Sequence, residues 1–189
     1  MKLTVPTMLT LLRIALIPVL VVVFYLPFNW TSLAAASIFA FASLTDWADG
    51  WIARRYNQFS AFGAFLDPVA DKLMVAVALM LTVQKHPTVW MTLWAAVIIG
   101  REIAVSALRE WMAELGQRAK VKVATLGKIK TVVQMLALVF LLYQKPLFGL
   151  PIFTIGEWLL AAAALLTLWS GFAYLRAAWP SMKEDSRGS

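Results

Sequence analysis

The chain is dominated by long apolar runs separated by short polar breaks. A bilayer core requires about 20 apolar residues per helix, and backbone polar groups in lipid have to be satisfied within helices. Six segments can be drawn, at residues 9–26, 30–53, 62–83, 89–108, 129–143 and 153–178. The pattern predicts an all-α integral membrane protein, a six-transmembrane-helix bundle with a short N-terminal juxtamembrane segment.

The composition leaves little room for anything outside the membrane. Of the 189 residues, 61% are hydrophobic and 14% charged, whereas a soluble domain is about half apolar and a quarter charged. We therefore expect a single membrane domain over residues 1–189.

The net charge of +7 is distributed unevenly among the polar breaks. Lys85 and Lys145 are the only Lys or Arg residues in the breaks that would lie outside the cytoplasm. Cytoplasmic loops carry an excess of Lys and Arg, so both termini are expected in the cytoplasm. The other breaks contain Arg54, Arg55, Arg118, Lys120, Lys122, Lys128, Lys183 and Arg187. The sequence has no pattern of basic residues interleaved with aromatic residues, so it does not indicate a nucleic-acid partner.

The residue inventory restricts the metal chemistry. There is no cysteine, and His86 is the single histidine, so a thiolate or His-rich zinc site is excluded. Any metal has to be bound by oxygen ligands, which favour Mg²⁺, Mn²⁺ or Ca²⁺. His86 lies beside Pro87 on the predicted far side and is expected to be an interfacial loop residue.

Four of the five aspartates are clustered in the sequence. They are Asp46 and Asp49 in the second segment and Asp67 and Asp71 in the third, while Asp185 lies in the polar tail. Each pair has a spacing of three or four residues, which places both members on one helix face. We expect the two helices to pack antiparallel, with the four carboxylates converging at one depth at the cytoplasmic interface.

Four neighbouring carboxylates out of water repel one another strongly. Divalent cations offset this repulsion, and a Mg²⁺ site leaves positions open for substrate phosphates. The cluster therefore predicts a metal site for a pyrophosphate-linked substrate. The alternative is a structural role, in which the aspartates form salt bridges with Arg54, Arg55, Lys72 or Arg101.

The residues around the aspartates form a larger motif, Asp46-x2-Asp49-Gly50-x2-Ala53-Arg54-x8-Gly63-x3-Asp67-x3-Asp71. This motif resembles the signature of the CDP-alcohol phosphotransferases. The resemblance implies two ions of Mg²⁺ or Mn²⁺, held by the four aspartates, with Asp71 also acting as general base. It implies a CDP-binding site formed by Asp46, Asp49, Gly50, Ala53, Arg54, Gly63 and Asp67. The small residues have an alternative role, since they also let membrane helices pack closely.

The stretch Pro6–Arg13 resembles a second family pattern but has Thr7 where relatives commonly have Asn. Thr10 and Arg13 are candidates for positions near the nucleotide.

The acceptor alcohol is predicted from cations away from the aspartates. Arg101 lies inside an apolar segment, where a charge is costly, and Glu102 offers it a local ion pair as an alternative role. Further cations are Arg109, Lys128 and Lys130. Two or three such groups together could form a phosphate-binding pocket, for which Arg101, Arg109 and Lys128 are the predicted residues.

Residues 100–103 and 126–131 resemble the bacterial phosphatidylglycerophosphate synthase branch of the family. That resemblance implies CDP-diacylglycerol and sn-glycerol 3-phosphate as substrates, a homodimer, and a location in the bacterial inner (cytoplasmic) membrane. It also implies acyl chains that leave laterally between helices.

Other functions remain open at the level of sequence. The acceptor could instead be inositol phosphate, serine or phosphatidylglycerol. A Mg²⁺-dependent membrane prenyltransferase also uses aspartate-rich motifs, but on two helix pairs of a larger bundle. A metal transporter would need a polar route across the membrane, which the outer halves of these segments do not offer.

Overall fold

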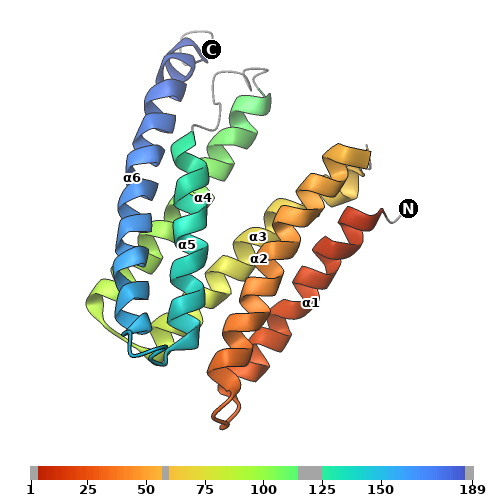
Figure 1. Ribbon diagram of the computed structural model, residues 1–189. Coiled ribbons are helices and arrows are strands. Elements are labelled where there is room, and N and C mark those ends of the chain that lie inside the picture. Colours follow the sequence, from red (N-terminus) through yellow and green to blue (C-terminus); the bar gives the residue numbers. More distant parts are fainter. Residues whose placement is uncertain (1–3, 57–59, 115–124, 186–189) are drawn as a thin grey trace.

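The computed structural model describes residues 4–56, 60–114 and 125–185, and these residues form six helices joined by short connections (Figure 1). The helices are α1 (Val5–Tyr25), α2 (Thr31–Tyr56), α3 (Ala61–Lys85), α4 (Val89–Glu114), α5 (Thr125–Tyr143) and α6 (Ile152–Asp185). The all-helical class and the six predicted elements are confirmed, and several helices extend beyond their apolar segments.

Helix α1 begins at Val5, four residues before the apolar segment that the sequence predicts from residue 9. Helix α1 is continuous from Val5, and Pro6 lies in its first turn, where the missing N–H of a proline is tolerated. The Met8 amide donates to the Thr4 carbonyl at 3.0 Å. The first turns of α1 therefore continue directly into its apolar part, which contains a second proline, Pro18, inside the helix.

Three helices are long and apolar enough to cross a membrane: α1, residues 89–112 of α4 and residues 152–172 of α6. Shorter apolar stretches lie within α2, at residues 31–46, and within α5, at residues 129–143. Helix α3 carries Asp67, Asp71 and Lys72 within its apolar sequence, which lowers its mean hydropathy.

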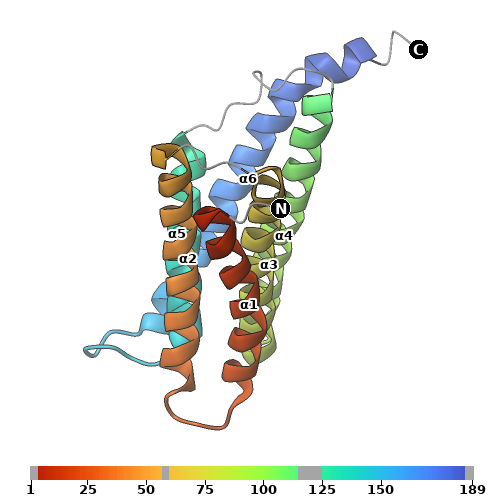
Figure 2. The same cartoon turned by 90° about the vertical axis from the view of Figure 1, so that its right-hand side faces the viewer.

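The helices pack in an order that sequence adjacency does not predict. Helix α1 packs against both α2 and α3, α5 packs against α6 and α2, and α4 packs mainly against α6. Helices α2 and α3 barely touch, so the expected direct packing of this pair is wrong. Figures 1 and 2 show α1 beside both helices.

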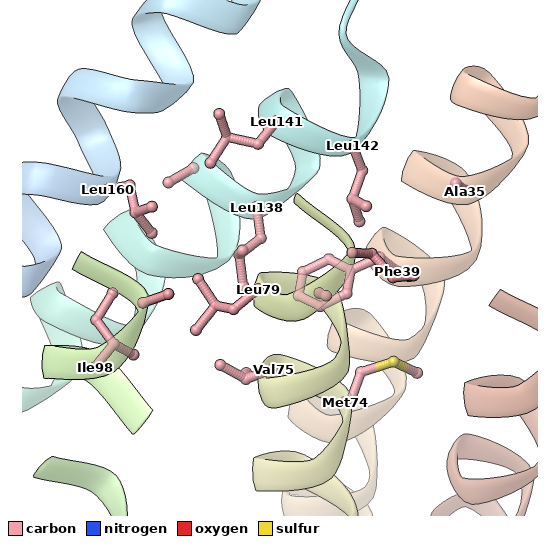
Figure 3. Packing of buried hydrophobic residues seen from close by; sticks show 14 of the residues in the cluster. Ala35, Phe39, Met74, Val75, Leu79, Ile98, Leu138, Leu141, Leu142 and Leu160 are labelled. Atoms are coloured by element: carbon pink, nitrogen blue, oxygen red, sulfur yellow. The ribbon is translucent and has the colours of Figure 1, made fainter. Parts of the chain in front are cut away.

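The hydrophobic core contains residues from all six helices. Figure 3 shows Phe39 of α2, Leu79 of α3 and Leu138 of α5 pointing toward one another, and all three are fully buried. Leu20 of α1, Ile98 of α4 and Leu160 of α6 complete the contribution of each helix. Burial of apolar area at about 25 cal/mol per Å² holds soluble cores together. Within lipid, the close packing of these side chains does so instead.

Candidate functional site

Arg13 joins the two aspartate-bearing helices. Its side chain projects from α1 and is only 1% exposed. Its Nη1 donates to Asp46 Oδ1 of α2 at 2.6 Å, and its Nη2 donates to Asp67 Oδ1 of α3 at 3.1 Å. A buried charge in a membrane helix costs several kcal/mol, roughly 2.5–3.5 on insertion scales. The two carboxylates offset that cost, which explains how α1 can pack between α2 and α3.

Asp46 and Asp67 remain accessible from outside the protein. Their side chains are 35% and 45% exposed. Asp71 is one turn beyond Asp67 on α3 and lies close enough to Asp46 and Asp67 for their charges to interact. The structure thus brings together three of the four predicted aspartates. Among the described residues, Asp46 and Asp67 form ion pairs with Arg13, which was not one of the four cations that we had considered.

A second buried polar cluster adjoins Asp71. Lys130 of α5 is 4% exposed, and its Nζ lies 3.2 Å from Glu102 Oε1 of α4. Gln134, one turn further along α5, donates its Nε2 to the same oxygen at 3.3 Å. Asp71 interacts electrostatically with both Glu102 and Lys130. Glu102 therefore pairs with Lys130, whereas a local pair with Arg101 was the alternative considered from the sequence.

Arg101 reaches across to the last helix. Its Nη2 donates to Ser170 Oγ of α6 at 2.8 Å, and its charge interacts with that of Lys130. An otherwise apolar cavity of about 570 Å³ between α4 and α6 includes Arg101 in its wall. Arg109 lies two turns further along α4 and is exposed. The side chain of Lys128 lies outside the described part of the structure.

Gly63 lies where Thr7 of α1 closely approaches the first turn of α3. Ser60 caps α3 by accepting the Gly63 amide at 2.9 Å, and the Ser60 hydroxyl also lies 2.9 Å from Thr7 Oγ1 of α1. A Cβ at residue 63 would lie 2.7 Å from Thr7 Oγ1. The absence of a side chain here lets the two helices meet, so the packing role of this glycine has direct support.

The remaining motif residues lie in α2, but their side chains are outside the described residues: Asp49, Gly50, Ala53 and Arg54. Within the described ranges, no group of three acidic or histidine side chains is arranged to hold an ion. The donor chemistry nevertheless fits Mg²⁺ or Mn²⁺, because the described groups offer only carboxylate oxygens from two helices. Mg²⁺ is usually bound by one or two carboxylates together with substrate phosphates.

His86 lies at the opposite end of the bundle, as expected. It caps the C-terminus of α3, and its ring lies 4.1 Å from the ring of Phe153. Burial lowers the pKa of His86 from its ordinary value, Lys85 lowers it further, and Glu157 opposes them. The imidazole is therefore neutral at pH 7. Because His86 lies at the opposite end of the bundle, it takes no part in the aspartate site.

Sequence reasoning identified the aspartates but missed most of their surroundings. Arg13 was a candidate for the nucleotide site and not for an ion pair. Lys130 was considered as one of the cations near the phosphate pocket but was not among the residues predicted for it, and Gln134 and Ser170 were not considered. Lys130 and Gln134 have helical i, i+4 spacing within an apolar segment, which is the signal that could have identified them.

Comparison with known proteins places these residues in a family. Residues 3–169 match the CDP-alcohol phosphatidyltransferase family. A Pseudomonas fluorescens protein named CDP-diacylglycerol–glycerol-3-phosphate 3-phosphatidyltransferase is 58% identical over 184 residues, covering 97% of this chain and 94% of that protein. Proteins of the same name from Salmonella choleraesuis (strain SC-B67) and Shigella flexneri are each 53% identical over 178 residues. These alignments cover 94% of this chain and 96% of each relative.

The match extends from α1 into α6 and includes the complete aspartate motif. It decides the enzyme class against the prenyltransferase and transporter alternatives. The three long apolar helices agree with a membrane-bound enzyme. The chain belongs to the CDP-alcohol phosphatidyltransferase family.

Proposed function

We propose that this protein transfers the phosphatidyl group of CDP-diacylglycerol to sn-glycerol 3-phosphate, forming phosphatidylglycerophosphate and CMP. The observation that carries the proposal is 53–58% identity, over nearly the full length, to proteins named for this reaction. The described geometry is compatible with it, since carboxylates and buried cations lie next to each other at one end of the bundle.

In this proposal the aspartates bind the diphosphate part of the donor. Asp46, Asp49, Asp67 and Asp71 would hold two ions of Mg²⁺ or Mn²⁺, which when bound would supply positive charge to offset that of the diphosphate and of the leaving CMP. The CDP group rests against the same face of α2 and the start of α3. Its further contacts are Gly50, Ala53, Arg54 and Gly63.

Arg13 has a positioning role in this proposal. Its two donor nitrogens fix the Asp46 and Asp67 carboxylates relative to each other before substrate binds. Fixed charges of this kind need no reorganisation during the reaction.

Asp71 is the proposed general base. It accepts the proton of the acceptor hydroxyl as that oxygen attacks the phosphorus bearing the diacylglycerol. The new P–O bond forms while the anhydride bond to CMP breaks, so CMP leaves with the bridging oxygen. Asp71 suits this role because it lies between the aspartates and the Glu102–Lys130 pair.

The acceptor phosphate is proposed to bind the cations beyond Asp71. Arg101, Arg109 and Lys128 form the set expected from sequence, and the position of Lys130 near Asp71 adds a fourth candidate. Arginine can bind phosphate bidentately, and lysine binds it as a point charge. The apolar cavity beside Arg101 offers space for an acyl chain that leaves the site between α4 and α6.

The proposal includes a location and an assembly. All six helices span the inner bacterial membrane as one domain of residues 1–189, with both termini and the active site on the cytoplasmic side. The concentration of basic residues in alternate breaks supports this orientation. A homodimer is part of the proposal and rests on the family resemblance alone.

An acceptor screen tests the proposed reaction. Purified protein is incubated with CDP-diacylglycerol, Mg²⁺ or Mn²⁺, and one acceptor at a time: glycerol 3-phosphate, inositol phosphate, serine or phosphatidylglycerol. Glycerol 3-phosphate is expected to give the fastest CMP release, with phosphatidylglycerophosphate as the lipid product. Faster release with another acceptor would refute the assignment within the family.

A further inference from the structure

A polar cavity, separate from the apolar cavity beside Arg101, lies at the end of the bundle opposite the aspartates. Three connections meet at this end, residues 26–30, 86–88 and 144–151 (Figure 1). The cavity has a volume of about 380 Å³, and Lys85, Lys145, Gln84, Gln144 and Asn29 are among its lining residues. No acidic residue lines it. Its size lies within the range of small-molecule sites.

The distribution of charge singles this cavity out. The chain has 17 Lys and Arg residues, yet Lys85 and Lys145 are the only two in or directly beside these three connections. They come from different elements, the last turn of α3 and the α5–α6 connection, and both line the same cavity. The position of Lys85 alone could be explained by the helix dipole, because a positive charge is favourable in the last turn of α3. Lys145 lies outside the helix, so that explanation does not apply to it.

The two ammonium groups keep donors available for a ligand. Lys145 Nζ donates to the Asn29 carbonyl, and an ammonium group has three donors. Neither lysine forms an ion pair within the described ranges. Among the residues that line the cavity are two cations and three amide side chains but no carboxylate, and this environment favours a phosphate-bearing ligand.

The surroundings of the cavity indicate that the ligand is a lipid. Tyr25 and Phe28 line it, and the Phe28 ring stacks on Trp30 at a centroid distance of 5.8 Å. All three side chains are more than half exposed, as is typical of the membrane interface. The connection of residues 144–151 extends sideways from the bundle (Figure 2), and Phe148 within it is 95% exposed.

We propose that this cavity binds the phosphate headgroup of an anionic phospholipid from the leaflet opposite the aspartate site, through Lys85 and Lys145. The exposed aromatic and aliphatic side chains beside it contact the acyl region of the same leaflet. The site shares no residue with the proposed transferase site, so either proposal can fail alone.

Calorimetric titration of the purified full-length chain in a neutral detergent tests the site. The probe is dioctanoyl phosphatidylglycerol, and its comparison ligands are dioctanoyl phosphatidylcholine and inorganic phosphate. Wild-type protein is expected to bind the anionic lipid at least about tenfold more tightly than it binds phosphatidylcholine or inorganic phosphate. Equal affinity for phosphatidylcholine would overturn the anionic preference, and equal affinity for inorganic phosphate would overturn the lipid assignment.

Three variants locate the binding. K85Q/K145Q is expected to weaken lipid binding about tenfold or more, whereas K85R/K145R retains the charges and the affinity. D46N is expected to keep this binding, because its substitution lies at the other end of the bundle. Unchanged CMP release by K85Q/K145Q shows that it is folded. Wild-type affinity in that variant, or loss of binding in D46N, would overturn the proposal.

Discussion

Arg13 is a buried cation whose two donor nitrogens contact carboxylates of different helices. Removing one partner of such an arrangement leaves the others uncompensated. Asp46 and Asp67 would then repel each other across the gap that Arg13 occupies. A bound divalent cation can supply the missing positive charge, so the need for Arg13 depends on metal.

The Arg13→Gln variant is therefore expected to be less stable when metal is absent. In EDTA we expect a loss of about 2 kcal/mol, the usual range for a hydrogen-bonded charge, and Mg²⁺ should restore part of it. Thermal unfolding in detergent measures both effects. Arg55→Gln removes an exposed arginine from α2 and serves as the charge-matched control. An R13Q variant as stable as R55Q in EDTA would contradict the account.

Substitution of Asp71 tests whether its carboxylate is the general base of the proposed reaction. The Asp71→Asn variant keeps the size of the side chain but cannot accept the proton of the acceptor hydroxyl. We expect CMP release to fall about 10²- to 10⁴-fold, while CDP-diacylglycerol binding changes little. Near-normal turnover would show that another group is the base.

At the residue scale, sequence could identify the acids but not their partners. The Asp46–Asp71 motif is visible because intramembrane acids are rare and their spacing is regular. The partner Arg13 lies 33 residues before Asp46, and only the packing of α1 between α2 and α3 brings them together. The same holds for Glu102 and Lys130, which are 28 residues apart.

At the scale of helices, Gly63 controls how α1 meets α3. An added Cβ at this position would lie 2.7 Å from Thr7 Oγ1 and 2.9 Å from Ser60 Oγ. At Gly100 of α4, by contrast, an added Cβ would have no heavy atom within 4 Å. The two glycines therefore form a matched pair.

The Gly63→Ala variant is expected to lose about 1–3 kcal/mol of stability through overpacking. Gly100→Ala is expected to be neutral or to gain up to about 1 kcal/mol, because alanine favours helix. Thermal unfolding of both variants in the same detergent measures the difference. Equal stability would mean that the close approach of α1 and α3 is not required.

Helix number was predictable because apolar runs and polar breaks alternate clearly. Helix contacts were not, because α2 and α3 are joined by a short connection yet barely touch. Short connections constrain where helix ends lie, whereas side-chain pairs decide which faces meet. The start of α1 at Val5 was missed because the prediction followed the apolar run that begins at residue 9, whereas a proline such as Pro6 is tolerated in a first helical turn.

At the scale of the whole molecule, the two ends of the bundle differ in chemistry. One end holds the aspartates, Arg13 and the buried Glu102–Lys130 pair, and the other has two lysines beside exposed aromatic residues. The alternation of basic breaks predicted this asymmetry. It did not show that Lys85 and Lys145 share a cavity, since they lie on elements far apart in the sequence.

The most direct test of the central claim is CMP release from CDP-diacylglycerol with glycerol 3-phosphate. The measurement compares wild type, D46N, D67N and D185N, the last being the aspartate outside the motif. Wild type and D185N are expected to release CMP in Mg²⁺ or Mn²⁺ and to lose activity in EDTA, while D46N and D67N are inactive in both conditions. Wild-type rates in EDTA, or in D46N and D67N, would contradict the claim that these carboxylates hold metal and the donor diphosphate.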